Sequence, residues 1–204
     1  MMRPMKFFIS AGEASGDLHG ADLVAALLRR APGAEITFLG GDLMAREAGH
    51  SPLVHYSEMA YMGFAEVLRH LPSIARILDK AKEELTAIRP DSLILIDYPS
   101  FNLKLARHAK SLGIPVFFYI SPKVWAWKEW RIKQMRRHCD KILSILPFEV
   151  DYFRGKGVDV EYVGNPSVAE VERKLNDIPT RGEFNLLHGL DPNRPLLALS
   201  LIHI

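Results

Sequence analysis

The sequence predicts an α/β protein in which a Rossmann-like parallel sheet is covered by helices on both faces. Short apolar runs alternate with segments of helical periodicity along the 204 residues, and this alternation is typical of a parallel sheet. Turns that contain Gly and Pro separate several of the helical segments from the next apolar run. A Gly-rich turn directly follows the first apolar run, at the position where open α/β sheets bind their ligands.

Six apolar runs are predicted strands, and they cover residues 7–10, 35–39, 92–97, 116–120, 141–146 and 161–163. Helical periodicity predicts helices over residues 20–30, 63–88, 102–111, 127–138 and 167–175. Arg89-Pro90-Asp91 ends the second of these helices, and the turn at 112–115 ends the third.

Apolar density falls after Gly164-Asn165-Pro166 and rises again after Arg194. We therefore expect a first domain over residues 1–166, a helix and linker over 167–193, and the first strand of a truncated second domain over 194–204.

Composition restricts the class of protein. A formal net charge of +2, with 48% hydrophobic and 25% charged residues, is ordinary for a globular protein and gives no general reason to expect nucleic-acid binding. Cys139 is the single cysteine, so an internal disulfide is excluded, a reducing cytoplasm is the simplest compartment, and a buried thiol is favoured over a catalytic one. No apolar run reaches the ~18 residues of a spanning helix, so any membrane contact should be peripheral. The eight histidines show no metal-ligand spacing, and we predict no metal site.

The Gly-rich turn, residues 11–21, carries two candidate ligand-binding side chains, Ser15 and Asp17. Either could cap the following helix, at whose start a hydroxyl or phosphate could dock. The turn lacks the G-x-G-x-x-G spacing and is acidic, which argues against a nicotinamide-dependent oxidoreductase. A plain capped turn between strand and helix is an equally good interpretation.

Asp97 ends the predicted strand at 92–97, where the crevice of an α/β sheet lies. It is a candidate general base or hydroxyl-binding group. The alternative is that Asp97 only accepts hydrogen bonds from loop amides, with Ser100 or Asn102 capping the next helix.

Three tryptophans lie among lysines and arginines directly after the strand at 116–120. The segment from Ser121 through Lys123, Trp125 and Trp127 suits a ligand with sugar, acyl and phosphate groups, or an anionic lipid surface. The alternative is that one or two tryptophans belong to the core and the cations to a solvated face.

Met62 and Phe64 open the long predicted helix. Most of its apolar stripe should be core, but an exposed first turn would offer these two side chains to an acyl chain or a bilayer.

Six ordered segments together resemble the lipid-A-disaccharide synthase family. They are AGEASGD at 11–17, MGFAEV at 62–67, IDYPSFN at 96–102, SPKVWAW at 121–127, LPFE at 146–149 and VGNP at 163–166. The family motif often reads I-D-x-P-D-F-N, so Ser100 stands here at the second acidic position. The Gly-Ser-Arg loop that follows the first strand of the family's second domain is replaced by residues 199–204.

The resemblance implies an inverting GT-B glycosyltransferase of bacterial lipid A biosynthesis, a step in making lipopolysaccharide. Such an enzyme joins UDP-2,3-diacylglucosamine to 2,3-diacylglucosamine 1-phosphate and releases UDP, without a cofactor, at the cytoplasmic face of the inner membrane. It further implies Asp97 as the base. The substrate-binding candidates are Ser15, Asp17, Met62, Phe64, Ser121, Lys123, Trp125, Trp127 and Asn165.

We expect this chain alone to bind a UDP-sugar poorly and to turn over little. The alternatives are another GT-B enzyme of UDP-sugars, such as an epimerase, and a non-catalytic lipid-binding module. The sequence leaves the oligomeric state, including a homodimer, open.

Overall fold

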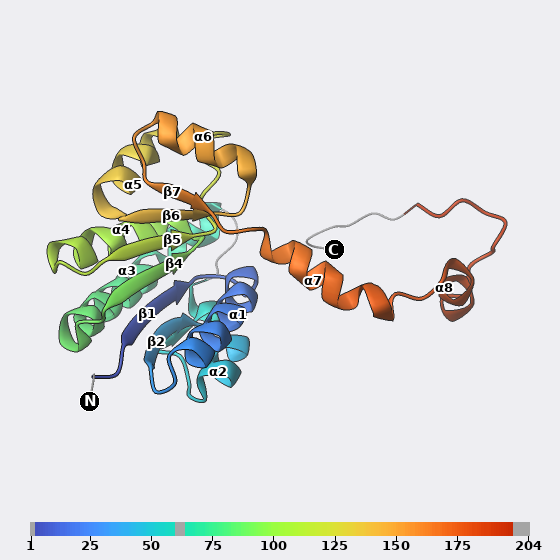
Figure 1. Cartoon of the computed structure of the whole chain (residues 1–204), viewed down its shortest axis with the longest axis horizontal. Coiled ribbons are helices and arrows are strands. Elements are labelled where there is room, and N and C mark those ends of the chain that lie inside the picture. The colour runs from blue at the N-terminus through green and yellow to red at the C-terminus, as the bar shows by residue number, and fades with distance from the viewer. Residues whose placement is uncertain (1–2, 60–63, 198–204) are drawn as a thin grey trace. The chain divides into compact units, whose positions relative to one another are not determined.

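The computed structural model (Figure 1) describes residues 3–59 and 64–197, and their side chains except those of 64–70 and 176. The chain divides into two units, residues 1–164 and 165–204. The first unit holds a parallel sheet of seven strands in the order β3-β2-β1-β4-β5-β6-β7. The predicted α/β fold with a Rossmann-like parallel sheet is therefore confirmed.

The strands are β1 (Lys6–Ala11), β2 (Glu35–Gly40), β3 (Val54–His55), β4 (Ser92–Ile96), β5 (Val116–Tyr119), β6 (Lys141–Ser144) and β7 (Val160–Tyr162). The helices of this unit are α1 (Ala14–Arg30), α2 (Asp42–Ala48), α3 (Phe64–Ile88), α4 (Pro99–Ser111), α5 (Ile132–His138) and α6 (Pro147–Gly155). Short 3-10 helices cover Tyr56–Glu58 and Glu129–Arg131. The second unit contains α7 (Pro166–Lys174), the 3-10 turn Leu175–Asp177 and α8 (Arg181–Leu187).

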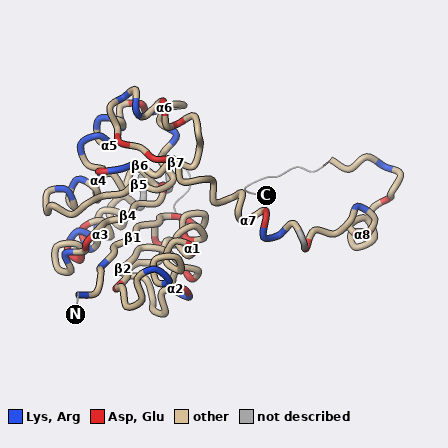
Figure 2. Tube along the Cα trace, viewed as in Figure 1, with Lys and Arg blue, Asp and Glu red and all other residues tan. Residues whose placement is uncertain are grey.

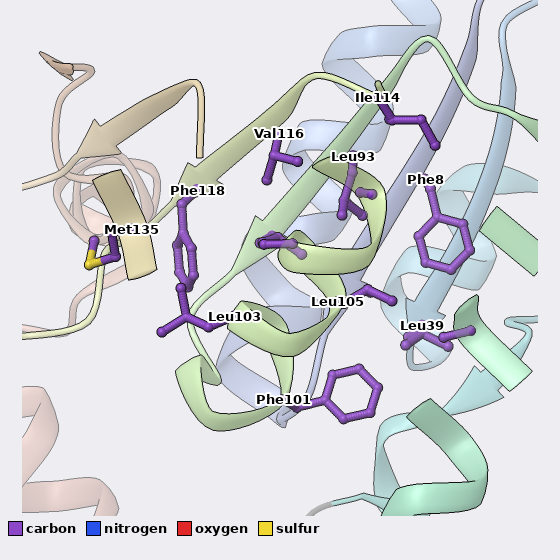
Figure 3. Close-up of a cluster of buried hydrophobic side chains, with 14 of the residues drawn as sticks. Phe8, Leu39, Leu93, Phe101, Leu103, Leu105, Ile114, Val116, Phe118 and Met135 are labelled. Atoms are coloured by element: carbon purple, nitrogen blue, oxygen red, sulfur yellow. The ribbon is translucent and has the colours of Figure 1, made fainter. Parts of the chain in front are cut away.

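Side chains on successive residues of a strand point to opposite faces of the sheet. The central strands therefore contribute side chains to two separate hydrophobic cores. Leu93 and Leu95 of β4 join a cluster on the face covered by α3, α4 and α5, which includes Phe8 and Phe118 (Figure 3). Ile94 and Ile96 join the cluster on the other face, beneath α1 and α2. Each such buried side chain stabilises the fold by ~1.5–3 kcal/mol, and the continuous apolar runs of the sequence reflect burial on both faces.

Several predicted boundaries are wrong for identifiable reasons. Helix α1 begins at Ala14 with Glu13 as its N-cap residue, so Ser15 and Asp17 lie inside its first turn and neither caps it. Helix α4 begins at Pro99, a residue that suits a first helical turn, so Ser100 and Asn102 do not cap it either. The predicted helix at 127–138 starts only at Ile132.

Three helices and one strand were not predicted. Helices α2 and α6 have seven and nine residues, and strand β3 has two, lengths at which a hydrophobic period gives a weak signal. Helix α8 covers part of the region expected to be a linker, and a capping box formed by Thr180 and Glu183 marks its start. Residues 194–197 form no strand, and the rest of that predicted strand lies outside the described residues.

Candidate functional site

A hollow of about 310 Å³ lies where β4, β5 and β6 end. The strand order reverses direction between β1 and β4, and ligands of open α/β sheets bind at the carboxyl ends of strands near such a reversal. The hollow is lined by Asp97, Pro99, Ile120, Ser121, Pro122, Lys123, Trp127, Arg131, Ile145, Leu146 and Glu149. Four of the residues predicted for the site, Asp97, Ser121, Lys123 and Trp127, are thus brought together.

The backbone at Asp97 is held in an uncommon conformation. Asp97 and Tyr98 have φ angles of 45° and 46°, in the left-handed region that non-glycine residues seldom adopt. Ile120, which follows β5 and lines the same hollow, has a φ of 56°. Strained backbone of this kind clusters at functional sites, where the surrounding structure must hold it in place.

The side chain of Asn102 holds the backbone at Asp97 in this conformation. This fully buried side chain donates its amide to the carbonyl oxygens of Asp97 and Ile96 at 2.7 and 3.2 Å. Its own oxygen accepts a hydrogen bond of 2.7 Å from the hydroxyl of Ser10, at the end of β1. Asn102 therefore ties the ends of two neighbouring strands to the turn that presents Asp97.

The electrostatic surroundings of Asp97 favour a carboxyl group that can accept a proton. Partial burial raises the pKa of Asp97, and the negative charge of Glu13 raises this pKa further. The cations of Lys123 and Arg131 act in the opposite direction but are weaker influences. A carboxylate with a raised pKa beside a ligand-sized hollow is a candidate general base.

The hollow also contains positive charge. Arg131 is 6% exposed and donates from Nη2 to the hydroxyl of Ser100 at 2.8 Å. Burial lowers the pKa of Arg131, while the nearby charge of Asp97 raises it. Together with exposed Lys123, this guanidinium could bind a phosphate within reach of the carboxylate.

The tryptophans are at the surface rather than in the core. Trp125, Trp127 and Trp130 are 41%, 63% and 59% exposed, so the alternative that one or two of them are core residues is wrong. The Lys128 ammonium lies 4.0 Å from the centre of the Trp127 ring. We call residues 123–130 the tryptophan loop; it presents indole rings and cations side by side.

Glu149, like Arg131, is a residue of the hollow that the sequence analysis does not include in the site. It lies in the first turn of α6, is 1% exposed, and lines the hollow. Its carboxylate accepts hydrogen bonds from the Ser121 hydroxyl and the Trp125 indole N–H, both at 3.1 Å, and from the Ser144 hydroxyl. The available signal was an acid two residues after Pro147, where a strand gives way to a helix.

Ser15 and Asp17 lie elsewhere and do not line this hollow. The carboxylate of Asp17 is buried and accepts hydrogen bonds from the amides of Gly41, Leu43 and Met44 at 2.7, 3.1 and 3.1 Å, at the start of α2. The exposed Ser15 hydroxyl donates to Glu13 at 2.7 Å. Their assignment to the substrate stays a prediction, while Glu13 is the residue of this turn whose charge acts on Asp97.

Four other predicted site residues are not placed in the hollow. Trp125 belongs to the tryptophan loop but is not one of the lining residues. Asn165 caps α7, accepting a hydrogen bond of 3.0 Å from the Ser167 amide, and belongs to the second unit. Met62 lies outside the described residues. Phe64 begins α3, but its side chain is outside them too.

The described part of the chain contains no group of three or more His, Cys, Asp or Glu side chains that could hold a metal ion. In the same part, none of the helices is both long enough and apolar enough to cross a bilayer.

The fold is shared with solved structures of low sequence identity. The UDP-N-acetylglucosamine 2-epimerase of Rickettsia bellii superposes with a TM-score of 0.63 at 15% identity, covering 93% of this chain and 52% of that one. The UDP-GlcNAc 2-epimerase of Neisseria meningitidis, solved with UDP-GlcNAc, gives a TM-score of 0.63 at 12% identity over 90% of this chain and 52% of that one. At such identities the likeness establishes the fold alone.

Curated relatives are much closer in sequence. A lipid-A-disaccharide synthase of Trichlorobacter lovleyi is 44% identical over 97% of this chain and 50% of its own length. That of Myxococcus xanthus is 42% identical over 98% of this chain and 51% of its own length. The chain thus spans about half the length of the curated relatives it matches. The sequence model of the lipid-A-disaccharide synthetase family matches residues 7–202, so the chain belongs to that family.

Proposed function

We propose that this chain forms the acceptor-binding half of a glycosyltransferase that makes the lipid A disaccharide. The reaction joins UDP-2,3-diacylglucosamine to 2,3-diacylglucosamine 1-phosphate and releases UDP. The observation that carries the proposal is the position of Asp97, a partly buried carboxyl group with a raised pKa, in one hollow with Lys123 and Arg131. Family membership supports the same reaction.

In this reaction, we assign a role to several residues of the hollow. Asp97 takes the proton of the acceptor's 6-hydroxyl as the oxygen bonds to C1 of the donor sugar, while the bond from C1 to the UDP oxygen breaks and UDP leaves with the electron pair. Lys123 and Arg131 hold the acceptor phosphate, and Trp127 packs against the sugar or an acyl chain. Met62 and Phe64 stay sequence-based candidates for contacting the acyl chains.

The first experiment measures binding of 2,3-diacylglucosamine 1-phosphate with short acyl chains to this chain by calorimetry. We expect binding that weakens about tenfold in Arg131→Met, a factor worth ~1.4 kcal/mol. The dephosphorylated acceptor should bind the wild-type chain and Arg131→Met equally. Absence of acceptor binding to the wild-type chain, or equal loss for both acceptors, would contradict the proposed site.

The second experiment measures transfer. The 204-residue chain should turn over little, because its curated relatives are about twice as long. In the longer protein that carries this half, Asp97→Asn should lower turnover by ~10²–10⁴-fold, the usual contribution of a general base, with acceptor binding changed little. Turnover that survives Asp97→Asn would exclude Asp97 as the base.

We propose in addition that the tryptophan loop makes a peripheral contact with an anionic membrane. Its exposed indoles suit the boundary between headgroups and acyl chains, and Lys123 and Lys128 suit lipid phosphates. In flotation, the chain should associate with vesicles of phosphatidylcholine and phosphatidylglycerol more than with phosphatidylcholine alone. Trp125→Ala with Trp127→Ala should reduce this association, and vesicle binding that is unchanged by the pair would exclude the loop as the contact.

The formation of a homodimer stays a prediction. Sedimentation of the chain would test it.

A further inference from the structure

Glu149 is a buried carboxylate that the proposed reaction does not use. Its three hydrogen-bond donors come from separate places: Ser144 ends β6, Ser121 follows β5, and Trp125 lies in the tryptophan loop. Among the described residues, no buried side-chain oxygen or nitrogen lacks a hydrogen-bond partner, so this carboxylate is satisfied where it lies.

Of the three hydrogen bonds to Glu149, the one from Trp125 connects this carboxylate to the tryptophan loop. The Trp125 ring is 41% exposed and packs edge-on against Phe148, with the ring centres 5.2 Å apart and the planes at 79°. A half-exposed indole has little apolar burial to hold it, so the hydrogen bond of 3.1 Å from its N–H to Glu149 fixes its direction.

Fixing Trp125 also fixes the residues on either side of it that line the hollow. Lys123 precedes Trp125 by two positions and Trp127 follows it by two, and both face the hollow. The Lys123 carbonyl accepts a hydrogen bond from the Ala126 amide at 3.1 Å, and Val124 is buried, so the loop turns as one tight unit around the anchored indole.

We propose that Glu149 is a positioning residue, which holds the tryptophan loop through Trp125 so that Lys123 and Trp127 face the acceptor beside Asp97. The inference rests on the proposed function for the identity of the acceptor. The anchoring of Trp125 can be tested without any ligand.

The ligand-free test observes Trp125 alone, in a Trp127→Phe, Trp130→Phe background. In Glu149→Ala, we expect the emission of Trp125 to shift to longer wavelength and its quenching by acrylamide to rise at least twofold. Glu149→Gln should behave like the parent, because its oxygen can accept from Trp125 while its amide donates to the two serine hydroxyls. Asp151→Ala, which removes an exposed acid of the same helix, is the matched control and should leave Trp125 unchanged.

The second test measures binding of the short-chain 2,3-diacylglucosamine 1-phosphate in the otherwise wild-type chain. Glu149→Ala should weaken binding about tenfold, which corresponds to ~1.4 kcal/mol, whereas Glu149→Gln and Asp151→Ala should bind within about twofold of wild type. Trp125→Phe keeps the ring but loses the N–H, and it should also weaken binding. This variant changes a half-exposed residue, so it keeps the test valid if Glu149→Ala does not fold.

The outcomes separate the two proposals. If the wild-type chain binds no acceptor, the proposed function fails, while the spectroscopic test of Trp125 still decides whether Glu149 anchors the loop. If the wild-type chain binds acceptor and folded Glu149→Ala binds equally well, or if Trp125 emission does not respond, the positioning role is overturned. It is also overturned if Glu149→Gln is as defective as Glu149→Ala, because charge and not hydrogen bonding would then be the property that matters.

Discussion

The side-chain amide of Asn102 donates a hydrogen bond of 2.7 Å to the backbone carbonyl of Asp97. The same side chain accepts from Ser10, whose strand β1 lies beside β4 in the sheet. One buried polar residue thus holds together the strand end that carries the candidate base and its neighbour. This contact makes the position of Asp97 a property of the packed sheet and not of a free loop.

Asn102→Ala should destabilise the chain by ~2–3 kcal/mol, because the Ser10 hydroxyl and the carbonyls of Ile96 and Asp97 would lose a buried partner. Asn102→Asp, which has nearly the same shape, should cost more, since a buried carboxylate would face carbonyl oxygens. Urea unfolding followed by circular dichroism measures both. A stable Asn102→Asp variant at neutral pH would contradict the role given to this amide.

Asp97→Asn should make the folded chain more stable at neutral pH, because partial burial and Glu13 disfavour the charged carboxylate. The pKa of Asp97 is raised in the folded state, so the wild-type side chain favours folding fully below its ordinary pKa of 3.8 and loses this contribution as pH rises through the folded value. The advantage of Asp97→Asn should therefore grow with pH.

Thermal unfolding between pH 4.5 and 8 measures this effect. We expect a gain of roughly 2–4 °C at the upper end, the shift that ~1 kcal/mol produces in a domain of this size, and a smaller gain at the lower end. Asn also tolerates the left-handed backbone at this position. A gain that falls as pH rises would show that the carboxylate is stabilised by the site.

Gly12→Ala should disturb the site, because the turn that contains Gly12 packs closely against the turn that contains Tyr98. A methyl group on Gly12 would lie 2.4 Å from ring atoms of Tyr98, the residue next to Asp97. We expect a loss of ~1–3 kcal/mol in the free energy of unfolding, the usual cost of overpacking.

Gly155→Ala is the matched control for Gly12→Ala. A methyl group there meets no heavy atom within 4 Å, and Ala is the better helix former at the end of α6. This variant should be neutral or slightly more stable in the same denaturation experiment. Equal effects of the two substitutions would rule out the contact with Tyr98 as the cause.

Cys139 should be almost unreactive in the folded chain. Burial raises the pKa of this thiol to about 12, so very little thiolate is present at pH 8. We expect labelling by iodoacetamide at pH 8 to be at least about a hundredfold slower than for the chain in guanidinium chloride. Rapid labelling under native conditions, read by mass spectrometry, would contradict this picture.

The sequence by itself determined the class of fold, the six longer strands and the presence of Asp97 at a strand end, because hydrophobic periodicity is a local property of the chain. It also indicated Ser121, Lys123 and Trp127, which follow the adjacent strand and do reach the same hollow as Asp97. The six segments that resemble the lipid-A-disaccharide synthase family were readable from the sequence as well.

Only the tertiary structure decided which polar side chains are buried and what they contact. Glu149 bonds to Trp125 and Ser121, 24 and 28 positions away, and Asp17 bonds to amides 24 to 27 positions away. Neither set of hydrogen bonds can be recognised from a local sequence pattern, because each forms where strands that are distant in the sequence end side by side. Asp17 therefore supports helix α2, and Glu149, absent from the predicted site, lies at the wall of the hollow.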